Sequence, residues 1–125
     1  MSKPRTIAVV DDDQTTLVLV CEMLQAMGFQ VQSFSSANAL NLARKQQVYS
    51  ALILDLSMPD VDGFELIYQL ADSSPVEPLL IMSTLPANII DVAKVICQSL
   101  QMPVLGVLSK PFSNEELQHA LQTLG

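Results

Sequence analysis

The chain has 125 residues, the size of one ordinary domain, and half of them are apolar. Its formal net charge is −7 with no basic stripe, so direct nucleic-acid binding is not expected. Two cysteines and one histidine cannot build a usual zinc site, and no apolar run approaches the roughly 18 residues of a spanning helix. We expect a cytoplasmic protein without a signal peptide, in which Cys21 and Cys97 are reduced core thiols.

The first half of the chain alternates apolar runs with helical patterns. The run TIAVV is typical of a buried strand, and it stops at Asp11. Gly28 is a typical helix stop, and a serine caps the helix that follows. The predicted elements are a strand over 6–10, a helix over 15–27, a strand over 29–34, a helix over 35–47 and a strand over 51–55.

The second half continues the same alternation. Ser113 and Glu116 have the spacing of a capping box that opens the last helix. The predicted elements are a helix over about 63–70, a strand over 78–83, a helix over 88–101, a strand over 104–109 and a final helix from 113. Strands alternating with helices predict an α/β fold, a doubly wound parallel sheet with helices on both faces.

In such sheets ligands bind beyond the carboxyl ends of the strands, and here polar residues stand at those ends. They are Asp11, Asp12 and Asp13 after the first strand, Asp55 after the third, Ser83 and Thr84 at the fourth, and Lys110 after the fifth. Carboxylates brought this close repel one another, and a divalent cation removes the penalty. Oxygen ligands with room for water suit Mg²⁺. The set predicts a site for phosphoryl transfer, in which the cation and Lys110 neutralise the phosphoryl oxygens.

Four segments, VVDDDQ, LILDLSMPDVDGFEL, LLIMST and VLSKPF, together resemble the response-regulator receiver family of two-component signalling. The resemblance covers the whole chain, as a single receiver domain over 1–125 that is stand-alone or excised from a longer regulator. It implies a flavodoxin-like, CheY-like (βα)5 fold with strand order 2-1-3-4-5. The implied function is a phosphorelay switch, with slow self-dephosphorylation rather than enzymatic turnover.

The resemblance also assigns roles at the predicted site. Asp55 is the implied phosphoacceptor from a sensor histidine kinase or phosphotransfer protein. Asp11, Asp12, Asp55 and the backbone carbonyl of Ser57 are the implied ligands of Mg²⁺, for which Mn²⁺ can substitute. Ser83 takes the position of the switch hydroxyl, and Lys110 pairs with the phosphoryl group. The Lys110–Pro111 bond is expected to be cis, as in the family.

Several nearby residues have plainer interpretations. Asp13 or Thr15 suits the start of the first helix better than a metal. Asp60 and Asp62 suit a turn before Gly63. Thr84 competes with Ser83 for the switch role, and its bulk at a position where the family has Ala or Gly could narrow access to Asp55. His119 is expected in solvent, and Met58 is expected to contribute to packing.

Three features depart from the common receiver pattern. Val107 stands where many receivers have a rotating Tyr or Phe, so any signal is expected to run through Ser83 and the helix over 88–101. The stretch 83–110 is longer than in common receivers and is similar to receivers fused to EAL-type cyclic-di-GMP phosphodiesterases. Apart from one narrow polar stripe, the helix over 88–101 is apolar. This pattern indicates either that the longer connection folds over part of the helix or that the helix forms a surface for a partner.

That partner surface is expected to include the neighbouring strand 104–109 and the final helix, and to bind an effector domain or a second copy. The main alternative function is a phosphorylation-independent interaction module, but such modules usually lack an acid or the lysine. A phosphatase of the haloacid-dehalogenase type needs a second Asp two residues after the nucleophile, where this chain has Ser57. No G-x-G-x-x-G or P-loop pattern indicates nucleotide binding.

Overall fold

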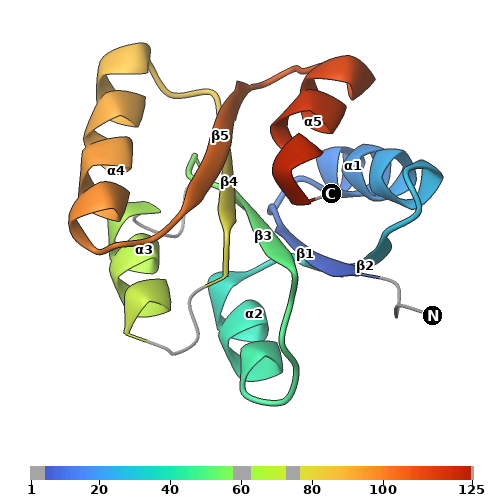
Figure 1. Ribbon diagram of the computed structural model, residues 1–125, viewed down its shortest axis with the longest axis horizontal. Coiled ribbons are helices and arrows are strands. Elements are labelled where there is room, and N and C mark those ends of the chain that lie inside the picture. The colour runs from blue at the N-terminus through green and yellow to red at the C-terminus, as the bar shows by residue number, and fades with distance from the viewer. Residues whose placement is uncertain (1–4, 58–62, 73–76, 125) are drawn as a thin grey trace.

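The computed structural model in Figure 1 describes residues 5–57, 63–72 and 77–124. Five parallel strands form one sheet in the order β2-β1-β3-β4-β5, as expected from the resemblance. The elements are β1 (Thr6–Val10), α1 (Gln14–Ala26), β2 (Gln30–Phe34), α2 (Ala37–Arg44), β3 (Ala51–Asp55), α3 (Gly63–Ala71), β4 (Leu79–Ser83), α4 (Ala87–Ser99), β5 (Val104–Ser109), α5 (Asn114–Ala120) and a short 3₁₀ helix (Gln122–Leu124).

Apolar side chains of the central strands alternate between two cores, one on each face of the sheet. Helices α1 and α5 cover one face, and α2, α3 and α4 cover the other (Figure 1). In β3, Ile53 faces the α1/α5 core, whereas Leu52 and Leu54 face the opposite core. Strands β3 and β4 are buried along their whole length, which is why their sequences are apolar without alternation.

Local chemistry explains where the helices end. The Asp13 carboxylate accepts the Thr15 N–H at 3.1 Å and caps α1, as predicted for this end of the helix. Gly28, at φ 95°, closes α1, and the Phe29 N–H donates to the Leu24 carbonyl of the helix, so β2 begins one residue later than predicted. The Ser113–Glu116 capping box opens α5 as predicted.

Two other predicted elements are shorter in the structure. Helix α2 spans Ala37–Arg44 with Ser36 as its N-cap, rather than 35–47. Helix α4 ends at Ser99, because Gln101 adopts a left-handed φ of 59° that stops the helix before the predicted 101. These differences leave the order of the elements unchanged.

The register of the sheet aligns the carboxyl ends of its strands. Asp55 lies opposite Met82, and Ser83 lies opposite Ser109. The residues that follow β1, β3, β4 and β5 therefore meet at one edge, as the sequence predicted.

The predicted apolar surface of α4 is only partly covered. Ile90, Ala93 and Cys97 are buried, but Val92 and Val95 are 48% and 62% exposed. The longer connection within residues 83–110 therefore leaves part of α4 exposed to solvent. Both cysteines are free thiols; Cys97 is buried and Cys21 is half-buried.

Candidate functional site

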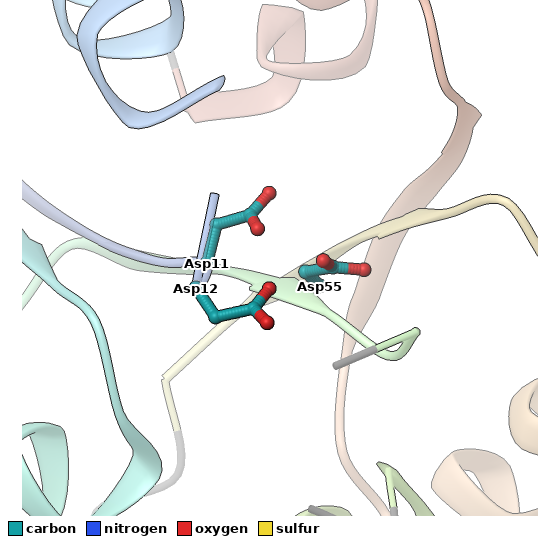
Figure 2. Close-up of side chains that lie close together, drawn as sticks. All are labelled: Asp11, Asp12 and Asp55. Carbon is teal, nitrogen blue, oxygen red and sulfur yellow. The ribbon is translucent and has the colours of Figure 1, made fainter. Parts of the chain in front are cut away.

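Three carboxylates meet at the carboxyl edge of the sheet (Figure 2). Asp11 and Asp12 follow β1, and Asp55 is the last residue of β3. One carboxylate oxygen from each lies within 4.8 Å of the others. Asp11 and Asp55 are buried, at 0% and 2% exposure, and Asp12 is exposed. The site thus holds two fixed acids beneath one that reaches solvent.

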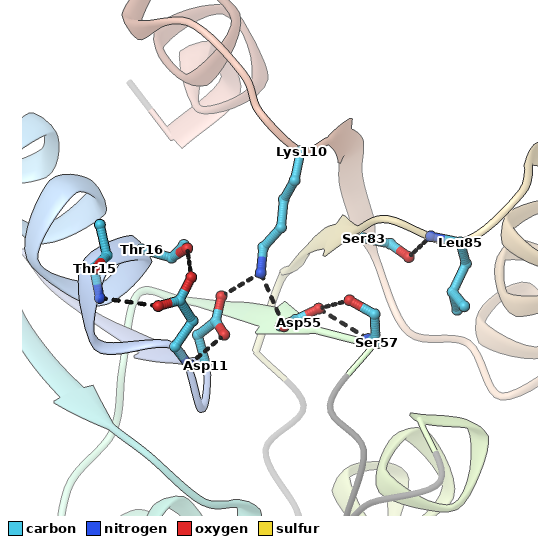
Figure 3. A network of polar contacts seen from close by, with 9 residues as sticks. Asp11, Thr15, Thr16, Asp55, Ser57, Ser83, Leu85 and Lys110 are labelled. Carbon is cyan, nitrogen blue, oxygen red and sulfur yellow. Dashed lines mark hydrogen bonds and ion pairs between the residues drawn. The ribbon is translucent and has the colours of Figure 1, made fainter.

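Lys110 extends from the end of β5 and places its ammonium between the two buried acids (Figure 3). Its Nζ lies 2.6 Å from Asp11 Oδ2 and 3.0 Å from Asp55 Oδ2. Its backbone N–H donates to the Ser83 carbonyl at 3.0 Å, and the Lys110–Pro111 peptide bond is cis, as expected. The lysine is therefore anchored by its backbone at the point where its side chain enters the site.

Ser57 holds the other oxygen of the Asp55 carboxylate. Its backbone N–H donates to Asp55 Oδ1 at 2.8 Å, and its hydroxyl donates to the same oxygen (Figure 3). Both oxygens of Asp55 are thus engaged, Oδ1 by Ser57 and Oδ2 by Lys110. The sequence indicated a role for the Ser57 carbonyl, but it gave no sign of the hydroxyl contact.

These contacts shift the pKa values of the three groups. Burial raises the pKa of Asp11 above its ordinary value, although the nearby Lys110 ammonium opposes the change. Burial acts on Asp55 in the same direction, but the hydrogen bonds from Ser57 and Lys110 outweigh it and lower the pKa of Asp55. Burial would lower the pKa of Lys110, yet its contacts with Asp11 and Asp55 raise it. These contacts therefore favour the ionised form of the Asp55 carboxylate.

The donor set fits a hard divalent cation. Three carboxylates supply oxygen ligands, and exposed Asp12 leaves a side open for water. Asp11 Oδ2 is buried and lies 2.6 Å from the Lys110 ammonium. Residues 11, 12 and 55 could thus hold Mg²⁺.

The other predicted residues are placed as follows. Asp13 faces α1, where it also accepts the Thr16 hydroxyl at 2.9 Å, in agreement with its predicted capping role. Ser83 is buried, and its hydroxyl accepts the Leu85 N–H at 2.8 Å. Thr84 is exposed and lines a cavity of about 340 Å³ together with Lys110.

Five other residues named in the sequence analysis differ in what the structure says of them. His119 is exposed, as expected. Val107 is half-buried and packs against the core beneath α4. Met58, Asp60 and Asp62 lie outside the described residues.

Comparison with known proteins agrees with this geometry. The model of the response regulator receiver domain family matches residues 7–122. The chain is 34% identical over 120 residues to the transcriptional regulatory protein CreB of Escherichia coli, covering 95% of this chain and 50% of CreB. It is also 34% identical over 121 residues to GltR of Pseudomonas aeruginosa, covering 96% of this chain and 48% of GltR. The chain thus spans about half the length of these curated relatives.

Solved structures share the fold. A response regulator from Colwellia psychrerythraea superposes with a TM-score of 0.82 at 27% identity, over 98% of this chain and 97% of that one. CheY4 of Vibrio cholerae superposes with a TM-score of 0.84 at 23% identity, over 98% of this chain and all of that one. In the described part of the chain, no helix is long and apolar enough to cross a membrane. The chain belongs to the response regulator receiver domain family of two-component signalling.

Proposed function

We propose that the chain accepts a phosphoryl group on Asp55, in a Mg²⁺-dependent reaction, from a sensor histidine kinase or a phosphotransfer protein. One observation carries the proposal: a buried carboxylate at the end of the central strand is kept ionised between Lys110 and Ser57, with Asp11 and Asp12 beside it. Each of these groups has a use in phosphoryl transfer, and burying their charges costs free energy.

In the proposed reaction, a lone pair of Asp55 forms the bond to phosphorus, and the donor leaves with the electron pair of the bond that breaks. Asp11, Asp12, Asp55 and the Ser57 carbonyl would hold Mg²⁺ or Mn²⁺, which supplies positive charge for the phosphoryl oxygens. Lys110 contributes a second positive charge, 3.0 Å from Asp55 Oδ2. The chain itself thus provides the nucleophile, its orientation and a fixed ammonium.

The test is intact-mass analysis after incubation with acetyl phosphate and Mg²⁺. We expect a gain of one phosphoryl group, lost on treatment with hydroxylamine and absent in Asp55→Asn or in excess EDTA. Asp91→Asn, which changes an exposed acid on α4, should be phosphorylated like the wild type. Wild-type protein that gains no phosphoryl group would instead support a phosphorylation-independent interaction module.

We further propose that the signal leaves through Ser83 and the segment that follows it. Ser83 now accepts the Leu85 N–H, so turning its hydroxyl towards a phosphoryl group on Asp55 would release this bond at the start of the loop before α4. Val107 offers no aromatic ring to rotate, which leaves this loop as the proposed route. Spectra of the free and beryllofluoride-bound protein test the proposal, because an unmoved 83–100 segment would contradict it.

The proposed output surface is the face formed by α4, β5 and α5, and its partner is an effector domain or a second copy of the chain. Val92 and Val95 support this assignment, because both stay exposed on α4. Val95→Gln should weaken association in sedimentation experiments, and a wild-type protein that stays monomeric at high concentration would count against a dimer. Direct nucleic-acid binding by this chain is not part of the proposal, since its charge is −7.

Other expectations stay proposals as well. Three of them depend on sequence outside this chain: the domain boundaries 1–125, whether the domain is stand-alone or excised from a longer regulator, and the resemblance to receivers fused to EAL-type phosphodiesterases. The free thiols Cys21 and Cys97 fit a reducing compartment, so we propose the cytoplasm as its location.

A further inference from the structure

Strand β2 forms one edge of the sheet, and no strand in the described part of the chain pairs with its outer side (Figure 1). On its inner side it pairs with β1 in regular register along its whole length. The Gln30 N–H donates to the Arg5 carbonyl at 2.8 Å, so the backbone groups of Gln30 face β1. Because the hydrogen-bonding side alternates along a strand, the N–H and C=O groups of Val31 and Ser33 point outward.

The outer edge of β2 lacks the usual protection against pairing with another strand. Natural sheets protect their free edges with charged side chains, prolines or bulges. The opposite edge strand, β5, has such a feature, because its pairing with β4 shifts register between Leu79 and Leu80. The segment FQVQSF, residues 29–34, contains no charged residue and no proline. The edge formed by β2 is therefore the one that is open to a further strand.

An exposed valine lies beside this edge on the face of the sheet that α2 covers. The Gln32 side chain donates to Gln47 at 3.0 Å and accepts the Tyr49 hydroxyl. Val48 stands between these two partners of Gln32 in the chain, and its side chain is 70% exposed. These hydrogen bonds hold the Gln32 side chain against its own protomer and keep the apolar Val48 close to β2.

A second exposed valine lies on the opposite face, which α1 covers. The side chain of Ser33 contacts the Cys21 thiol of α1. Val18 precedes Cys21 by about one helical turn, so both residues lie on the same side of α1. The Val18 side chain is 55% exposed. A strand added to β2 would therefore find apolar surface on both faces of the sheet.

We propose that β2 is a self-association surface, at which two copies of the chain pair their β2 strands antiparallel about a two-fold axis through Gln32. The Val31 N–H of one copy donates to the Ser33 carbonyl of the other, and that Ser33 N–H donates to the Val31 carbonyl. The two-fold axis repeats both hydrogen bonds, and the two sheets become continuous. The inference does not depend on phosphorylation of Asp55.

Two observations favour a second copy over an unrelated strand. The outward-facing groups of Val31 and Ser33 are placed symmetrically about Gln32, so each strand supplies every donor and acceptor that its copy requires. In addition, two chains of net charge −7 repel each other, and an uncharged strand is a place where they can approach with little local repulsion.

Disulfide cross-linking of Gln32→Cys, in a Cys21→Ala background, tests the pairing. The axis places the two copies of residue 32 opposite each other with Cα atoms about 4.5 Å apart, which is within the range of a disulfide. Gln30→Cys is the matched control, because it is exposed on the same strand and face, but its two copies would lie about 13 Å apart. We expect copper phenanthroline to cross-link Gln32→Cys about tenfold or more faster than Gln30→Cys. Adding Val95→Gln on α4 should leave the cross-linking of Gln32→Cys unchanged.

Ser33→Pro removes one outward N–H and leaves the hydrogen bonds to β1 intact, since the Ser33 N–H faces away from β1. Ser33→Ala is its control, because it loses the hydroxyl but keeps the N–H. In sedimentation equilibrium, Ser33→Pro should associate about tenfold or more weakly than the wild type, and Ser33→Ala should stay within about twofold. Amide exchange followed by NMR should slow at Val31 and Ser33 as the wild-type concentration rises, but not at Gln30, which already bonds to β1. Circular dichroism checks that each variant is folded.

Four outcomes would overturn the inference. Equal cross-linking of Gln32→Cys and Gln30→Cys would exclude the proposed register, and a cross-link that Val95→Gln abolishes would assign the contact to α4. Amide exchange at Val31 and Ser33 that is independent of concentration would exclude the added hydrogen bonds. A folded Ser33→Pro variant that associates as tightly as the wild type would exclude β2 as the interface. None of these outcomes affects the proposed role of Asp55.

Discussion

Arg44 and Glu77 form a buried ion pair at the amino end of the sheet, away from Asp55. Arg44 is the last residue of α2, and Glu77 lies in the segment that enters β4. The guanidinium donates from Nε to Oε2 at 2.9 Å and from one terminal nitrogen to Oε1 at 2.7 Å. The two side chains are only 6% and 5% exposed. The pair therefore joins α2 to the central part of the sheet through a contact from which water is excluded.

We predict that Arg44→Met destabilises the fold by about 3–5 kcal/mol, because it leaves the Glu77 carboxylate buried without its two donors. That is a large part of the roughly 5–15 kcal/mol typical of a domain. Arg44→Met combined with Glu77→Leu should recover most of the loss, since apolar side chains of similar volume often replace a buried ion pair at little cost.

Urea unfolding followed by circular dichroism gives the free energies for the double-mutant cycle. Lys45→Met is the matched control, because it removes an exposed charge next to Arg44, and it should change stability by less than about 0.5 kcal/mol. The reasoning is wrong if Arg44→Met costs less than about 1 kcal/mol, or if the double variant is as unstable as the sum of the single variants.

Four further predictions concern other parts of the molecule. Gln101→Gly should stabilise the protein by about 1 kcal/mol and raise its melting temperature by about 4 °C, because φ is 59° at this position. Ser113→Ala should cost about 1 kcal/mol in urea unfolding, since it removes the hydroxyl that accepts the Glu116 N–H at the start of α5. Burial raises the pKa of the thiols of Cys21 and Cys97, so iodoacetamide at pH 8 should label both slowly in the folded protein and rapidly in urea. Cys97 should react more slowly than Cys21, because it is more deeply buried. Equally rapid labelling of both thiols in the folded protein would contradict this prediction. Mg²⁺ at about 100 times its dissociation constant should stabilise the wild type by about 2.7 kcal/mol, and Asp12→Asn should lose most of this gain at the same concentration.

The order of the elements could be predicted from the sequence because it depends on local patterns. The apolar run at 51–55 coincides with β3, which is buried along its whole length. A strand that is covered on both faces has no polar positions before its end. Asp55 interrupts this run, and that interruption marked the site. The acids, the lysine and the hydroxyls meet because parallel strands end at one edge, which is a property of topology.

Element ends and hydrogen-bond partners could not be predicted in the same way. Pro78 has no N–H to donate to the sheet, yet its carbonyl accepts the Leu52 N–H at 2.9 Å, and β4 begins only at the next residue. The Ser83 hydroxyl bonds to the Leu85 backbone, and the Ser57 hydroxyl bonds to Asp55. These contacts depend on the path of the loop backbone, and residue type alone does not determine that path.

The charges at the site explain why the proposed phosphoryl transfer would need a cation. Asp11, Asp12 and Asp55 carry three negative charges when ionised and Lys110 carries one positive charge, which leaves a net charge of −2. A phosphodonor brings further negative charge, so its approach to the bare site is unfavourable. A bound Mg²⁺ would bring the net charge to zero, and converting the Asp55 carboxylate to a doubly charged acyl phosphate would then lower it only to −1. Because Lys110 already contacts both buried acids, the ammonium alone cannot offset the charge of an incoming phosphoryl group, and a cation would make the proposed transfer electrostatically feasible.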